Sequence, residues 1–188
     1  MDLNNQKTSE YSDEELLELS LENTAYFSLL VKRYKEKFFY YLKRFAGFRN
    51  DDIEDVIQNS FIKIYKNLNN FDPKLKFSSW AYRIVHNEAI DEIRRQKRNN
   101  LPLLPELEIP DEDINLSEEL DIKLEKEKIK KVLKELKEEY REIIVLRFFE
   151  HKEYKEISDI LKKPIGTICT QIDRAKKQFK DKYQKYVK

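Results

Sequence analysis

Apolar residues recur at three-to-four spacing along almost the whole chain, which is the period of amphipathic α-helices. One run places these apolar side chains on a single helical face: Phe27, Leu30, Val31, Tyr34, Phe38, Tyr41, Leu42 and Phe45. The next run places Ile53, Val56, Ile57, Ile64 and Leu68, together with the small polar Ser60, on one face that is expected to be core. With only two glycines among 188 residues, the pattern predicts an all-α fold.

Capping residues divide the first hundred positions into four helices. Ser12 followed by Glu15 forms a capping-box pattern, which predicts a helix to about residue 21. Either Asn23 or Thr24 caps the next helix, and Gly47 ends it. Asn50 is expected to cap the third helix. Residues 69–73 break that helix, and either Ser78 or Ser79 caps the fourth, in which Trp80 is expected to be a core residue.

An acidic, proline-containing segment separates two predicted helical domains. Residues 101–116 include Pro102, Pro105 and Pro110 and show no helical period, so they are expected to form a flexible linker. We expect a tail and first helix over residues 1–22 and one small domain over residues 23–100. A second small domain over residues 117–188 would begin at a helix capped by Ser117.

The end of the chain carries a helix-turn-helix pattern. Ile157, Ile160 and Leu161 would pack one helix, Lys162 and Lys163 would form the turn, and the next helix would start near Pro164. Polar side chains line the outward face of that second helix, where a recognition helix contacts bases and phosphates: Thr167, Cys169, Thr170, Asp173, Arg174 and Lys177. A plain surface pair of helices is the alternative interpretation.

Charge is unevenly distributed although the net charge is only +1. Residues 60–98 hold nine bases against four acids, and residues 128–188 hold eighteen bases against ten acids. Residues 101–121 hold eight acids and no base. This pattern favours two nucleic-acid-facing modules joined by a tether, and the alternative is a set of solvated helices with accidental charge blocks.

The rare residue types exclude several classes of site. Cys169 is the single cysteine, so an intrachain disulfide or a cysteine metal cluster is impossible. His86 and His151 lie far apart in sequence, and we expect both at the surface rather than in a metal or catalytic site. No cofactor is expected. The acidic N-terminus and the lack of a long apolar run predict a cytoplasmic protein without a membrane span.

Four segments resemble the extracytoplasmic-function (ECF) group of sigma-70 family RNA polymerase sigma factors. Residues 154–177 (YKEISDILKKPIGTICTQIDRAKK) resemble region 4.2, and residues 139–150 (EYREIIVLRFFE) resemble region 4.1. Residues 54–65 (EDVIQNSFIKIY) resemble region 2.2, and residues 77–95 (FSSWAYRIVHNEAIDEIRR) resemble regions 2.3 and 2.4. The resemblance implies a non-enzymatic initiation factor that directs core RNA polymerase to promoters.

The resemblance also implies partners and site residues in the first domain. Region 2 of such factors docks on the clamp helices of the largest polymerase subunit, and the matching positions are Asp55, Gln58, Asn59 and Ile62. The loop 69–77 matches the one that captures a base flipped from the minus-10 element, while basic side chains would hold phosphates. The minus-10 residues implied are Asn69, Asn70, Phe71, Lys74, Lys76, Phe77, Arg83, Asn87, Arg94 and Arg95.

Region 4 would bind the minus-35 element and the flap of the second largest polymerase subunit. Cys169 and Gln171 stand where Lys, Ser or Arg are frequent in the family, which predicts an altered minus-35 preference. The acidic linker could enter a basic channel of the polymerase or act as a spacer. Anti-sigma proteins that sequester the sigma factor are common in the family, and whether one binds this chain is left open by the sequence. A stand-alone helix-turn-helix regulator and an adaptor that only occupies polymerase are the competing functions.

Overall fold

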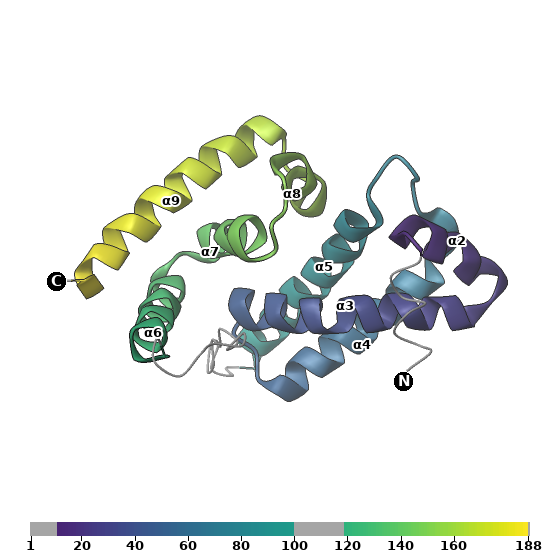
Figure 1. Ribbon diagram of the computed structural model, residues 1–188, viewed down its shortest axis with the longest axis horizontal. Coiled ribbons are helices and arrows are strands. Elements are labelled where there is room, and N and C mark those ends of the chain that lie inside the picture. Colours follow the sequence, from purple (N-terminus) through teal and green to yellow (C-terminus); the bar gives the residue numbers. More distant parts are fainter. Residues whose placement is uncertain (1–10, 100–118, 188) are drawn as a thin grey trace.

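The computed structural model describes residues 11–99 and 119–187, with side chains from residue 124 onward in the second range, and both ranges are helical (Figure 1). The first range contains helices α2 (Asp13–Glu22), α3 (Thr24–Phe45), α4 (Asn50–Lys66), the 3-10 turn η1 (Leu68–Asn70) and α5 (Phe77–Arg98). The second contains α6 (Glu119–Glu135), α7 (Glu138–Ile144), the π-helical turn η2 (Val145–Phe149), α8 (Tyr154–Leu161) and α9 (Ile165–Val187). These ranges contain no strand, so the all-α prediction is confirmed. The acidic segment 101–116 and Ser117 lie outside the described residues.

Local capping signals fix the start of α2 and both ends of α3. The Ser12 backbone N–H donates to Glu15 Oε2 over 2.7 Å, and the Glu15 N–H donates to Ser12 Oγ over 3.1 Å. Hydrogen bonding of the Glu15 carboxylate to the backbone and side chain of Ser12 lowers the pKa of Glu15. The cap of α3 is Asn23, whose Oδ1 accepts from the Ala25 N–H at 2.9 Å. Gly47 follows α3 with φ 64°, a backbone conformation that glycine adopts without strain.

The expected caps of α4 and α5 were wrong. Arg49 precedes α4, and Asn50 is its first residue and accepts from Lys43 Nζ at 2.7 Å. Helix α5 begins at Phe77, before both serines. The free N–H of Phe77 donates to Glu14 Oε1 of α2 over 3.0 Å. A carboxylate from another helix therefore caps α5, and its charge also suits the positive end of the helix dipole.

The face of α3 that was predicted to be buried packs against α4 and α5. Leu30, Tyr34, Phe38, Tyr41, Leu42 and Phe45 are at most 3% exposed. The predicted face of α4 is also buried, including Ser60, whose hydroxyl donates to the Val56 carbonyl over 2.6 Å. Trp80 is 8% exposed, in agreement with its prediction as a core residue.

Helices α8 and α9 form the predicted helix-turn-helix. Ile157 and Ile160 of α8 and Ile168 and Ile172 of α9 are buried, and Lys162 adopts the left-handed conformation at φ 54° that closes the turn. Before this pair of helices, α7 is continued directly by the π-helical turn η2. Such a turn inserts an extra residue into the helical path and shifts the side chains that follow it.

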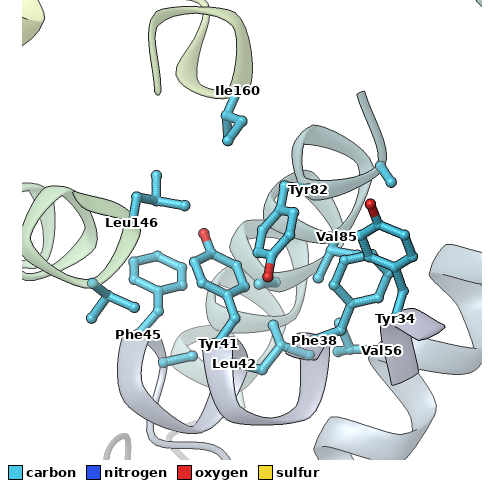
Figure 2. Close-up of a cluster of buried hydrophobic side chains, with 14 of the residues drawn as sticks. Tyr34, Phe38, Tyr41, Leu42, Phe45, Val56, Tyr82, Val85, Leu146 and Ile160 are labelled. Carbon is cyan, nitrogen blue, oxygen red and sulfur yellow. The ribbon is translucent and has the colours of Figure 1, made fainter. Parts of the chain in front are cut away.

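The two halves of the chain pack on each other. Helix α8 lies against α5, while α7 and η2 lie against α3 (Figure 1). Figure 2 shows Leu146 and Ile160 facing the rings of Tyr41, Phe45 and Tyr82, so one apolar core runs through both halves. The sequence predicted two modules and a tether but not this contact.

The contact places His86 inside the structure rather than at the surface. Its side chain is 13% exposed, and its Nδ1 lies 2.6 Å from Glu142 Oε1 and 3.4 Å from the Tyr41 hydroxyl. The contact with Glu142 is an ion pair only when the imidazole is protonated. The surface prediction for His86 was wrong because it assumed no partner for this side of α5. His151 is exposed as expected.

The cap that α2 supplies to α5 gives the first testable prediction. Replacing Glu14 with Ala leaves the Phe77 N–H without its acceptor, and we expect a loss of about 1 kcal/mol in the free energy of unfolding. Urea denaturation measures this change. Glu18→Ala, an exposed acid on the same helix, is the matched control. Equal losses in the two variants would contradict the capping role.

Candidate nucleic-acid and protein interfaces

The outer face of α4 presents the four predicted docking residues together. Asp55, Gln58, Asn59 and Ile62 are all exposed, and Ile62 is 44% exposed. A groove of about 540 Å³ lies beside them between α3 and α4. Its lining residues are Phe27, Val31, Lys35, Glu54, Ile57, Gln58, Phe61, Ile62, Tyr65 and Lys66. An apolar groove with a charged rim has the anatomy of a protein-docking surface.

The sequence interpretation missed part of this groove. Phe27 and Val31 were assigned to the buried face of α3, but both are only partly buried and line the groove. Tyr65 is 41% exposed and packs its ring 5.1 Å from that of Phe27. The available signal was the width of the apolar face of α3, which exceeds what its neighbouring helices cover.

A second pocket of about 420 Å³ brings η1 and α5 together. It is lined by Lys63, Asn67, Asn70, Trp80, Ile84, Asn87, Glu88 and Asp91. Two predicted minus-10 residues, Asn70 and Asn87, thus meet in one pocket although they lie on different elements. Lys63 and Glu88 form an ion pair beside them. The polar lining offers amide, ammonium and carboxylate groups that can hydrogen-bond to the edge of a base.

The predicted aromatic residues of the loop support this pocket from behind. Phe77 is 1% exposed, so its ring is not accessible to a base, contrary to its expected minus-10 contact. Phe71 is half-buried, with its ring 5.3 Å from Trp80 and 6.4 Å from Phe77. Asn69 is exposed and lies outside the pocket lining. That Asn67, Glu88 and Asp91 line the pocket was not predictable from the sequence, because their positions depend on how α4 meets α5.

The predicted phosphate-binding cations fall into two groups. Lys74, Arg94 and Arg95 are exposed, and the arginines form ion pairs with the nearby Asp91 and Glu92. Exposed pairs of this kind contribute roughly 0–1 kcal/mol, so both arginines can exchange them for phosphates. Lys76 and Arg83 instead face α8. Lys76 Nζ lies 3.3 Å from Glu156 Oε1.

Arg83 is the least solvated of these cations. Its Nε and Nη2 are buried and make no hydrogen bond to the described residues. Burial lowers the pKa of Arg83, and the nearby carboxylate of Asp159 on α8 partly offsets that effect.

The outward face of α9 presents the predicted minus-35 residues. Thr167, Thr170, Asp173, Arg174 and Lys177 are exposed, and Cys169 is half-buried. Ile168, Ile172 and Ala175 fill the opposite face at 0% exposure. The Thr170 hydroxyl donates to the Gly166 carbonyl over 3.0 Å. Asp173 forms no ion pair in the part of the chain that the structure describes, so its carboxylate is available to a ligand.

No metal or membrane site emerges within residues 11–99 and 119–187. No group of three or more His, Cys, Asp or Glu side chains converges there. No helix in these ranges has the length and apolar character needed to cross a bilayer.

Known proteins resemble this chain in sequence and in fold. Residues 30–99 match the model of sigma-70 region 2, and residues 126–179 match that of sigma-70 region 4. The ECF RNA polymerase sigma factor SigW of Bacillus subtilis is 33% identical over 173 residues, covering 82% of this chain and 89% of SigW. The ECF sigma-E factor of Haemophilus influenzae is 33% identical over 168 residues, covering 84% of this chain and 87% of its own length.

Two solved structures share the fold. CnrH, solved in complex with the cytosolic domain of CnrY, has a TM-score of 0.67 at 23% identity, covering 88% of this chain and 93% of CnrH. The sigma factor RpoE of Bartonella quintana, solved with the anti-sigma factor NepR, has a TM-score of 0.64 at 20% identity. The match covers 84% of this chain and 96% of RpoE. Together with the two regional matches in their expected order, the identity to SigW shows that this chain belongs to the ECF sigma factors of the sigma-70 family.

Proposed function

We propose that this sigma factor acts in the cytoplasm by docking core RNA polymerase through α4, capturing a minus-10 base between η1 and α5, and reading the minus-35 element with α9. It catalyses no reaction itself, because melting is driven by tighter binding of the flipped strand. The observation that carries the proposal is the presence of three separate surfaces, each with the chemistry of its expected partner. A stand-alone regulator of duplex DNA would need only the last of them.

The α4 surface suits the clamp helices of the largest polymerase subunit. Ile62 and Tyr65 supply exposed apolar area at the mouth of the groove, while Asp55, Gln58 and Asn59 supply a polar rim. Interfaces of this composition concentrate their binding energy in a few central apolar and aromatic residues. Ile62 is the most accessible aliphatic contact of the groove.

Ile62→Glu tests the docking surface. The new charge would have to lose its water at the interface, and we expect core polymerase binding to weaken at least tenfold, equivalent to about 1.4 kcal/mol or more. Binding of a fluorescently labelled chain to core enzyme measures the effect. Leu21→Glu is the matched control, since Leu21 is 50% exposed on α2 and lies outside the groove. Equal binding by both variants would place docking elsewhere.

The pocket between η1 and α5 suits one unstacked base. Flipping a base costs a few kcal/mol, which hydrogen bonds and close packing in a pocket can offset. Asn70 and Asn87 can each donate and accept at the edge of that base. Lys74, Arg94 and Arg95 lie outside the pocket and suit the phosphates, which fix the position of the strand without reading its sequence.

Asn87→Ala tests base capture. Loss of the amide should cost about 1–3 kcal/mol of discrimination at one minus-10 position, leaving affinity for other sequences nearly unchanged. Competition among promoter variants for binding by the reconstituted holoenzyme measures this difference. Arg94→Ala is the contrasting variant, because loss of a phosphate contact should weaken all sequences alike and reduce the salt dependence. If Asn87→Ala also weakened all sequences equally, the pocket would not read a base.

The exposed face of α9 suits the major groove of duplex DNA. Arg174 is the cation at its centre, and arginine can form two hydrogen bonds to guanine. Cys169 and Thr170 beside it offer fewer cations than the family commonly has, which supports an altered minus-35 preference. The exposed ring of Phe148 offers an apolar contact for the flap of the second largest polymerase subunit.

Arg174→Ala tests the minus-35 contact. We expect upstream DNA binding by holoenzyme to fall by about 1–3 kcal/mol, with relaxed preference at one base pair. Footprinting of promoter DNA measures both effects. Lys185→Ala, an exposed cation near the end of the same helix, is the control. A wild-type footprint without upstream protection would exclude this role for α9.

An anti-sigma protein is a further proposed partner. The structure of Bartonella quintana RpoE was solved with its anti-sigma factor NepR, and that sigma factor shares the fold of this chain. Co-purification of core polymerase with the chain, followed by run-off transcription on a mixed promoter library, tests the whole proposal. Binding without specific transcription would favour an adaptor, and duplex binding alone would favour a stand-alone regulator.

A further inference from the structure

Asp173 is an exposed carboxylate of α9 that the fold leaves without a partner. Within residues 11–99 and 119–187, it takes part in no ion pair and no hydrogen bond. Two lysines follow it within one helical turn, where an acid and a base on the same helix can pair. Lys176 Nζ instead lies 5.9 Å from the centre of the Phe148 ring, and Lys177 is exposed to solvent. The carboxylate of Asp173 therefore contributes nothing visible to the stability of the chain.

Asp173 belongs to a row of residues along the side of α9 that faces away from the core. The row consists of Gly166, Thr170, Asp173 and Lys177, which follow one another at spacings of three to four residues and are all exposed. We term these four residues the outer row. Because the buried face of α9 lies on the opposite side, a duplex that docks on α9 meets the outer row first.

The first half of the outer row leaves room for a ligand and offers it hydrogen-bond acceptors. A Cβ added to Gly166 would meet nothing within 4 Å, so the packing of the chain does not require glycine there. The missing side chain instead allows a ligand to approach the helix closely. The Thr170 hydroxyl donates to the Gly166 carbonyl over 3.0 Å, so its proton is engaged and its oxygen can only accept. Thr170 and Asp173 together therefore present acceptors to whatever lies against them.

The charge of Asp173 restricts what it can contact on DNA. A duplex carries one phosphate charge for about every 1.7 Å of its axis, and these charges repel a carboxylate. In the major groove, guanine presents the acceptors N7 and O6, and thymine presents the acceptor O4 and a methyl group. The donors there are the N4 amine of cytosine and the N6 amine of adenine. Adenine places its acceptor N7 beside the amine, whereas cytosine carries a C–H there, so a carboxylate fits cytosine best.

We infer that Asp173 is a specificity-determining residue of α9, which accepts a hydrogen bond from the N4 amine of one cytosine in the minus-35 element. The inference rests on the proposed reading of duplex DNA by α9. Asp173 weakens binding to DNA in general and rejects guanine and thymine at one position, so it acts by repulsion as well as attraction. The neighbouring Arg174 selects guanine, and the two adjacent side chains thus read bases of opposite hydrogen-bonding character.

Selection from a library of duplexes tests this contact. The library takes a promoter that the reconstituted holoenzyme transcribes and randomises about ten base pairs of its upstream element, which is one turn of DNA. Sequencing of the bound fraction gives the preference at each position. With wild-type chain we expect cytosine to be enriched about tenfold over guanine and thymine at one position. Asp173→Ala should abolish this enrichment, keep the preferences at other positions and increase binding to the library as a whole.

Asp173→Asn provides the sharper comparison, because it keeps the size of the side chain and changes its hydrogen bonding. An amide accepts from N6 and donates to N7 of adenine, so the preference at that same position should change from cytosine to adenine. Asp181→Asn makes the same exchange at an exposed acid of α9 eight residues further along, about 12 Å away. This control should leave every base preference unchanged, which separates loss of negative charge from loss of base reading.

The same selection separates this inference from the proposed function. If wild-type chain selects an upstream sequence and both Asp173 variants select the same one, Asp173 is only a solvated charge, and α9 still reads DNA. If wild-type chain selects adenine at the position that Asp173→Ala affects, the assignment to cytosine is wrong. If wild-type chain selects no upstream base at all, the proposed role of α9 fails, and the contact of Asp173 fails with it.

Discussion

Tyr41, Phe45 and Tyr82 lie where α3, α5 and the second half of the chain meet, and the packing of their rings organises both halves. The Tyr41 ring is 5.3 Å from that of Tyr82 and 5.7 Å from that of Phe45. All three side chains are nearly inaccessible to solvent, and Leu146 and Ile160 close over them (Figure 2). Aromatic pairs of this kind contribute about 0.5–1.5 kcal/mol each beyond their buried area. The orientation of α5, and hence of its DNA-facing side chains, depends on this cluster.

The same helix α3 serves the core and the proposed polymerase contact. Its apolar face is wider than α4 and α5 can cover, so Phe27 and Val31 remain partly accessible and line the groove. Because this groove shares its walls with the core, its shape follows from core packing. An interface built in this way is held in shape before its partner arrives, which lowers the entropic cost of binding.

The cations of α5 illustrate how one set of charges can meet two partners. Arg94 and Arg95 form exposed pairs with neighbouring acids on their own helix, so DNA can take over those contacts. Lys76 and Arg83 instead lie beside acids of α8. A position that attracts phosphate also attracts carboxylate, and only the arrangement of the two halves determines which of them is present.

Much of the fold could be predicted from the sequence because it is local. The Ser12–Glu15 capping box, the turn at Gly47 and the two buried faces of α8 and α9 each depend on residues within a few positions of one another. The outward-facing side chains of α4 and α9 were predictable for the same reason, since the helical period alone determines which side chains share a face.

Contacts between distant segments were decided only by the tertiary structure. Glu14 caps α5 across 63 positions, Asn70 and Asn87 meet in one pocket, and His86 lies beside Glu142. The burial of Phe77 likewise depends on contacts with distant segments. The spacing of hydrophobic residues shows which face of a helix is apolar, but it does not show which neighbouring helix covers that face. Caps, pocket linings and buried charge pairs depend on that neighbour, so they emerge only when the helices are packed.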